Sequence, residues 1–259
     1  SDAVIEAWCP ELVSGEKLAS YCLTEPGAGS DAASLRTSAR RDGDDYVING
    51  SKVFISGAGE TDVLVVMLRT SDDGARGITA VLVPDAEGIS YGKKEAKMGW
   101  NAQPTRMVTF DDVRVPVANR LGAEGQGFSI AMMGLDGGRI NIATCSVGTA
   151  QQALEEATAY VQERRQFDTA IADFQHTQFK LADMLTELVA ARQMIRLAAS
   201  KLDNKDPQAT TYCAMAKRFA TDVGFQVCND ALQLFGGYGY IREYPKERHA
   251  SASDTRGYQ

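Results

Sequence analysis

The spacing of hydrophobic positions changes near residue 125 of this chain. Before it, between Tyr21 and about Arg120, short apolar runs with a period of two alternate with turn residues, which is typical of β-strands. Residues 62–68 are almost wholly apolar and predict a strand that is buried on both faces. Residues 78–83 predict the next strand. The turn signals between these runs predict an antiparallel β-sandwich or barrel-like domain.

Three further segments in this half also predict strands. Residues 46–56 contain the pair Asn49-Gly50, which predicts two strands joined by a tight hairpin turn, because Asn-Gly readily adopts positive φ angles. Residues 107–110 and 113–115 predict two more strands.

After Gly125 the apolar period becomes 3.6 residues and predicts three long amphipathic helices. Pro207 is the predicted first residue of the third helix, and Gly236-Gly237 end it. Three helices with short connections imply a bundle, which needs further helices from another domain or subunit to cover it. The order of elements predicts an α+β fold. The predicted apolar faces are Ile140, Ala143, Thr144, Val147, Ala150, Leu154, Ala157 and Val161; Leu181, Met184, Leu185, Leu188, Met194, Ile195 and Ala198; and Met215, Phe219, Val223, Val227, Ala231 and Leu234.

Composition narrows the class of protein. The chain has 259 residues, of which 44% are hydrophobic and 24% charged, as expected of one or two globular domains. The net charge of −7 argues against a nucleic-acid partner. No apolar run is long enough to suggest membrane insertion, and the first residues lack the pattern of a signal peptide. The five cysteines show no close pairing pattern, which predicts reduced thiols in an intracellular protein. Because the chain has only two histidines, we do not expect a metal site.

The most informative segment is Tyr21-Cys22-Leu23-Thr24-Glu25-Pro26-Gly27-Ala28-Gly29-Ser30-Asp31. A strand-like approach runs into a loop of glycines and small hydroxyl residues, which can place backbone N–H groups against a ligand. Taken alone, such a loop is more often an ordinary polar turn.

Further motifs favour a ligand-binding role for this loop over an ordinary turn. They are residues 19–27, 55–60, 99–106, 137–143 and 236–240, the last reading Gly236-Gly237-Tyr238-Gly239-Tyr240. Together with the β-then-α order, they resemble the acyl-CoA dehydrogenases from about Pro10 to Pro245. The resemblance implies a remnant of an N-terminal helical domain in residues 1–18, a flavin-binding β-domain in 19–123 and a helical bundle in 124–245.

The resemblance also implies the chemistry. The family removes the α-proton of an acyl-CoA and passes the β-hydrogen as hydride to FAD, and here the motifs point to a short branched-chain acyl-CoA. The usual homotetramer and electron-transferring flavoprotein as electron acceptor are implied too. The location would be the bacterial cytoplasm or the mitochondrial matrix.

The resemblance assigns one wall of a flavin site to the β-domain. Its residues would be Tyr21, Cys22, Leu23, Thr24, Gly29 and Ser30, with Phe54, Ile55 and Ser56 from a second strand. The alternative for the second group is a half-buried strand end.

The helical half would hold the rest of FAD and part of the substrate. Arg164 would bind the pyrophosphate of a neighbouring subunit, because a guanidinium suits a diphosphate; the alternative is a cation that complements the helix dipole. The other FAD contacts would be Phe174, Gln175, Gln233, Leu234, Phe235, Gly236 and Gly237. The substrate contacts would be Ser30, Asp136, Gly137, Gly138 and Arg139, against the alternatives of helix packing at the glycines and a structural Asp136–Arg139 pair.

The catalytic base expected from the family has no counterpart here. In the family it is a Glu in an Ile-Leu-Glu-Gly-like segment, whereas residues 246–259 are small, polar and aperiodic, and predict a disordered, aberrant tail. Degenerate codons for residues 249–259 can encode that segment when they are read one nucleotide later. We therefore expect that the tail results from a frameshift, and sequencing of the coding DNA tests this. The alternatives are a non-catalytic FAD- or acyl-CoA-binding remnant, or a flavin oxidase or hydroxylase on the same fold.

Overall fold

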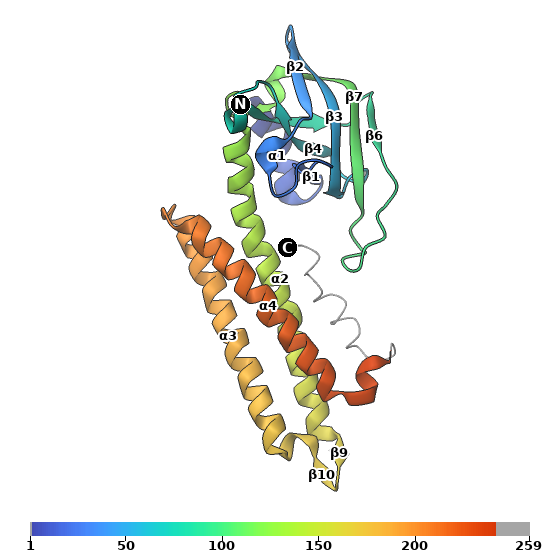
Figure 1. Cartoon of the computed structure of the whole chain (residues 1–259), viewed down its shortest axis with the longest axis vertical. Helices are drawn as coiled ribbons and strands as arrows, with labels where there is room; N and C mark the ends of the chain where they lie inside the picture. The colour runs from blue at the N-terminus through green and yellow to red at the C-terminus, as the bar shows by residue number, and fades with distance from the viewer. Residues whose placement is uncertain (1, 242–259) are drawn as a thin grey trace. The chain divides into compact units, whose positions relative to one another are not determined.

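The structure is a computed structural model that describes residues 2–241 (Figure 1). The described chain divides into two compact units. The sheet unit comprises residues up to 97 and 101–133, and the helical unit comprises residues 98–100 and those from 134 onward. The predicted tail, 246–259, and the last residues of the predicted bundle lie outside the described part of the chain.

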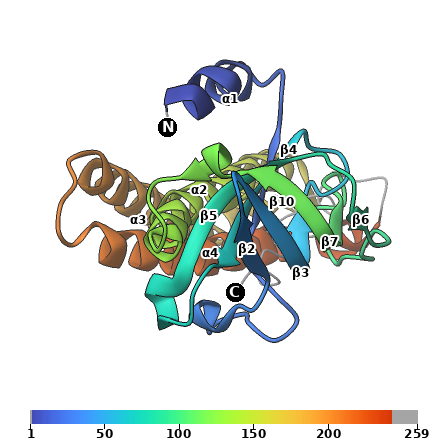
Figure 2. The same cartoon turned by 90° about the horizontal axis from the view of Figure 1, so that it is seen from above.

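The sheet unit is built on one eight-stranded sheet with the order β6-β7-β3-β2-β4-β5-β8 and with β1 beside β4. The α+β class is confirmed. The sheet is mixed rather than purely antiparallel, because β1 runs parallel to β4 and Ser38 pairs with Arg69 in parallel, and it forms no closed barrel within residues 2–241. Figure 2 shows β2, β3, β5 and β7 as a twisted fan. The strands are β1 (Ala19–Cys22), β2 (Ser38–Asp42), β3 (Asp45–Ser56), β4 (Val63–Arg69), β5 (Ile78–Pro84), β6 (Ile89–Tyr91), β7 (Thr105–Pro116) and β8 (Arg120–Leu121).

The predicted hairpin at Asn49-Gly50 is wrong, because β3 runs straight through it. The pairing of β3 with β7 shifts register between Ile48 and Gly50, so the pair forms a β-bulge. Gly50 has φ +135°, and Asn49 exchanges two hydrogen bonds with Asp112, at 2.8 and 3.0 Å. The predicted strands 107–110 and 113–115 are likewise one strand, β7, with Asp112 at φ +49°. The positive φ of Gly50, which would also suit a hairpin turn, is found here in a β-bulge.

The core of the sheet unit follows from the apolar runs. Leu64, Val66 and Leu68 are buried in one cluster with Val81 and Val83, while Val63 and Met67 are buried on the other face. The prediction of a strand buried on both faces at 62–68 is confirmed. Helix α1 (Asp2–Ser14) packs Val4 against Val63 and Leu82.

The helical unit contains the three predicted helices, α2 (Gly127–Glu163, which begins in the sheet unit), α3 (Gln175–Asp203) and α4 (Ala209–Leu234). Buried side chains of all three helices, such as Ala150, Leu188 and Ala220, form one core. Three predicted face positions, Thr144, Leu185 and Met215, are exposed instead. Short strands β9 (Arg165–Gln166) and β10 (Thr169–Ala170) connect α2 to α3.

The ends of α4 fit the predicted signals to within two residues. Pro207 lies in the turn before the helix rather than at its first position, and Asp206 accepts the Gln208 N–H at 2.8 Å there. At the other end, Gly236 has φ +58° and terminates the helix.

Candidate functional site

The glycine loop that follows β1 is fixed at its base and open at its tip. Glu25 and Ala28 exchange two backbone hydrogen bonds of 3.1 Å, and the Thr24 carbonyl accepts the Val53 N–H at 2.9 Å. A Cβ added at Gly27 or Gly29 would meet no atom within 4 Å. The tip therefore leaves room for a ligand to approach the backbone.

Tyr21 and Cys22 precede this loop on β1. The Tyr21 hydroxyl donates to the Ala131 carbonyl at 3.0 Å, and its burial raises the pKa of Tyr21 to about 12. Burial also raises the pKa of the Cys22 thiol to about 12, although nearby Lys52 opposes this. Both groups therefore stay protonated and uncharged at neutral pH. Cys22 and Leu23 are buried, so at these positions only the backbone can face a ligand.

The three residues predicted on the second strand differ in their surroundings. Phe54 has φ +57° and a 68% exposed side chain, whereas Ile55 is in the core and the Ser56 carbonyl accepts the Ser20 hydroxyl at 2.8 Å. A left-handed backbone costs a residue with a Cβ about 1–2 kcal/mol. Phe54 thus presents a large ring to solvent at an energetic cost, as functional sites often do.

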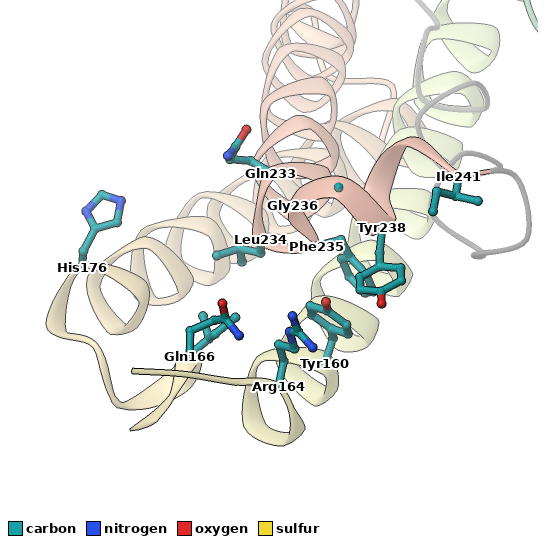
Figure 3. A pocket seen from close by; sticks show the side chains of 12 residues that line it. Tyr160, Arg164, Gln166, His176, Gln233, Leu234, Phe235, Gly236, Tyr238 and Ile241 are labelled. Carbon is teal, nitrogen blue, oxygen red and sulfur yellow. The ribbon is translucent and has the colours of Figure 1, made fainter. Parts of the chain in front are cut away.

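The helical unit carries a pocket of about 680 Å³ (Figure 3). Arg164 and the predicted segment 233–237 line it together, although they lie far apart in the sequence. Phe174 and Gln175 do not line it. The other residues that line the pocket were not predicted from the sequence. Two of them could have been found there, because Tyr238 belongs to the motif 236–240 and His176 follows the predicted residue Gln175. The full lining is Tyr160, Arg164, Gln166, Ile171, His176, Gln233, Leu234, Phe235, Gly236, Gly237, Tyr238 and Ile241.

The chemistry of this pocket suits a nucleotide with phosphate groups. Among residues 2–241, the Arg164 guanidinium has only the Tyr238 ring as a side-chain partner, at 5.8 Å from the ring centroid. Tyr160 and Phe235 stack beside it with centroids 4.1 Å apart. A Cβ at Gly236 or Gly237 would meet nothing within 4 Å. A cation without a carboxylate partner, an open backbone and aromatic faces can bind a diphosphate and a ring.

The segment Asp136–Arg139 lies within α2. Arg139 pairs with Asp136 at 2.6 Å, and the other Asp136 oxygen accepts the Thr210 hydroxyl, also at 2.6 Å. A structural pair is therefore present. Gly137 and Gly138 have nothing within 4 Å of an added Cβ, so helix packing among the described residues does not explain them.

Two other kinds of site have no support in the described chain. None of its helices combines the length and hydropathy required to cross a bilayer. Within residues 2–241, no group of three or more His, Cys, Asp or Glu side chains is placed to hold a metal ion.

The chain matches two family models along most of its length. "Acyl-CoA dehydrogenase, middle domain" matches residues 20–113, and "Acyl-CoA dehydrogenase, C-terminal domain" matches residues 125–257.

Relatives and solved structures agree with these matches. The chain is 59% identical over 242 residues to the mitochondrial isobutyryl-CoA dehydrogenase of Dictyostelium discoideum and 55% identical over 252 residues to that of Bos taurus. It covers 58% and 60% of these proteins, which cover 93% and 97% of it. The structure of butyryl-CoA dehydrogenase from Megasphaera elsdenii superposes with a TM-score of 0.94 at 44% identity, over 98% of this chain and 67% of that one.

Proposed function

Since this chain belongs to the acyl-CoA dehydrogenase family, we propose that it binds FAD and takes part in the α,β-dehydrogenation of a short branched acyl-CoA such as isobutyryl-CoA. The observation that carries the proposal is the pocket in the helical unit, which Arg164 lines together with Gly236 and Gly237, where an added Cβ would meet nothing within 4 Å. Identity of 55–59% to two isobutyryl-CoA dehydrogenases supports the choice of substrate.

Each unit supplies its own proposed contacts with FAD. Arg164 would bind the FAD pyrophosphate of a neighbouring subunit, Phe174 and Gln175 would flank the adenosine part, and the segment from Gln233 to Gly237 would contact FAD from the opposite subunit. In the sheet unit, Thr24, Gly29 and Ser30 would bond the flavin ring, and the exposed Phe54 ring would cover it. When bound, FAD accepts the hydride that leaves the β-carbon.

The substrate contacts in this proposal are Ser30 and the segment 136–139. Gly137 and Gly138, which have no side chain and no neighbour within 4 Å of an added Cβ, would let an acyl or pantetheine chain approach α2. Asp136 would hold Arg139 in position through their ion pair. No described residue is assigned as the base, since the sequence offers no Glu in an Ile-Leu-Glu-Gly context. We assign proton abstraction to no residue of this sequence.

The partners follow from the same family. A homotetramer and electron-transferring flavoprotein as electron acceptor are the proposed assemblies. The location that we propose is inside the cell, in the bacterial cytoplasm or the mitochondrial matrix, which the mitochondrial relatives support.

Titration of the purified chain with FAD tests the proposal. We expect flavin fluorescence to be quenched at one site per chain, and the visible flavin band to shift when isobutyryl-CoA is added without oxygen. We expect no bleaching of that band, because bleaching needs a base. Failure to bind FAD would contradict the proposal, whereas rapid bleaching would show that the chain does contain a base.

A further inference from the structure

Lys52 is among the largest side chains that are fully buried, with 0% of its surface exposed. Its ammonium group donates to Glu25 at 2.8 Å and to the Leu23 carbonyl at 3.1 Å. Buried charges are costly unless they are paired and hydrogen-bonded. A buried lysine in a β-strand therefore needs a reason, and its two partners both belong to the glycine loop.

Glu25 connects this lysine to the segment that follows the loop. Its side chain is 8% exposed, and it accepts the N–H groups of Arg36 at 2.7 Å and of Thr37 at 2.9 Å. The ion pair therefore satisfies backbone groups at Leu23 in the glycine loop and at Arg36 and Thr37 in the segment that follows it. Burial alone would raise the pKa of Glu25, but the hydrogen bonds from Lys52, Thr37 and Arg36 outweigh burial and lower it, so Glu25 is ionised at neutral pH.

The same stretch of β3 also sets the position of Phe54. The register of β3 against β7 shifts between Lys52 and Ile55, which forms a second bulge, and Phe54 lies in it. Between these residues, Val53 donates to the Thr24 carbonyl at 2.9 Å. Lys52 thus lies at the point where the glycine loop and the exposed ring are joined.

We propose that Lys52 and Glu25 form a positioning pair, which holds the segment from Leu23 to Thr37, including the glycine loop, and the Phe54 ring in one fixed arrangement against the flavin ring. The inference rests on the proposed function for the identity of the ligand. Neither side chain is assigned a contact with FAD, since Lys52 is fully buried and the Glu25 carboxylate is taken up by Lys52, Arg36 and Thr37. An apolar pair of the same size would leave the three backbone groups without partners, and the loop would lose its fixed form.

The test compares Lys52→Met with Arg114→Met. Both remove one cation from the sheet unit, but Arg114 is exposed and pairs with Asp42 and Asp45 away from the loop. In Lys52→Met we expect the amides of Arg36, Thr37 and Val53 to exchange hydrogen at least tenfold faster, while those of β4 and β5 keep their rates. The Kd for FAD should rise at least tenfold, and the visible band of bound FAD should lose its vibronic shoulders. Arg114→Met should stay within twofold of the unmodified chain in all three measurements.

Each outcome decides between the two proposals. If the unmodified chain does not bind FAD, the proposed function fails and the ligand named here fails with it. If that chain binds FAD and Lys52→Met binds it with the same Kd and spectrum, only the positioning pair is refuted.

Two further measurements cover the case in which Lys52→Met does not fold. Glu25→Gln keeps the volume but turns an N–H donor toward Arg36, so the same exchange pattern is expected. In the unmodified chain, the Arg36 and Thr37 amides must be protected relative to the exposed Gly29. Exchange as fast as at Gly29 would overturn the inference without any variant.

Discussion

At the residue scale, Arg164 and Arg165 are sequence neighbours with different surroundings. Arg164 lines the pocket and stacks on Tyr238, whereas Arg165 donates to the Asp168 carbonyl at 3.0 Å within the β9–β10 turn. Hydrogen bonds to charged groups contribute about 1.5–3 kcal/mol, which corresponds to about 10- to 150-fold in affinity. We therefore expect Arg164→Ala to raise the Kd for FAD by at least tenfold and to change the free energy of unfolding by less than about 0.5 kcal/mol.

Arg165→Ala is the matched control for this measurement, since it removes the same charge one residue away. Its Kd should stay within twofold of the unmodified chain when flavin fluorescence is titrated. Equal losses in both variants would indicate a general electrostatic effect, and no loss in Arg164→Ala would remove Arg164 from the FAD site.

Glu25 gives the second prediction at this scale, a dependence of stability on pH. Its pKa is lowered in the folded chain, so between that value and its ordinary pKa the unfolded state binds more protons. The stabilisation is fully present above the ordinary pKa of glutamate, and it is lost as the pH falls through the lowered folded value. Acid titration followed by amide exchange in β4 should show this loss in the unmodified chain and lack it in Glu25→Gln. The same slope in both chains would contradict the prediction.

At the element scale, two glycines of the helical unit should respond in opposite ways to alanine. Gly148 lies in α2 with nothing within 4 Å of an added Cβ, while a Cβ at Gly224 in α4 would lie 3.1 Å from both the Cβ and the carbonyl oxygen of Ser146. Alanine favours a helix interior over glycine by about 0.5–1 kcal/mol, so Gly148→Ala should stabilise the helical unit by that amount. Gly224→Ala should destabilise it by about 1–3 kcal/mol, because α2 and α4 approach closely there.

Urea unfolding followed by helical circular dichroism measures both changes. The opposite signs are the test, since both variants gain the same helix propensity. Stabilisation by Gly224→Ala would mean that α2 and α4 can separate slightly at Ser146 without cost.

Helices and strands could be predicted where the apolar pattern determines the structure. They could not be predicted where backbone geometry and strand pairing determine it. Residues 62–68 and the three helix faces carry enough buried side chains to fix their structure locally. Asn49-Gly50 has the same intrinsic preference in a hairpin and in a bulge, and only the pairing of β3 with β7 selects the bulge. The burial of Lys52 could not be predicted either, because a lone lysine in an alternating strand is normally solvated. Its partner Glu25 lies on the loop, and nothing in the local pattern pairs the two.

The candidate site shows the same division. Motifs identify the glycine loop and Arg164. Tyr160 and Ile171 line the pocket only because the end of α2 and the segment after it lie beside the last turn of α4. Contacts of that kind depend on how helices pack over long sequence separations, which the pattern of a single segment does not contain.

At the scale of the whole molecule, the described chain has separate cores in its two units. Leu188 belongs to the core of the helical unit and Leu68 to that of the sheet unit, and both side chains are 0% exposed. Truncation of a buried leucine to alanine costs about 2–5 kcal/mol. Since no residue belongs to both clusters, each substitution should lower the protection of its own unit against hydrogen exchange and leave the most protected amides of the other within about 0.5 kcal/mol.

Native-state hydrogen exchange resolved by residue can measure both units in one experiment. In Leu188→Ala the slowest amides of α3 and α4 should accelerate while those of β4 and β5 keep their rates, and Leu68→Ala should give the reverse. If either substitution accelerates both sets equally, the chain unfolds as one cooperative body and the two cores depend on each other. If each acts only on its own unit, the two cores unfold independently.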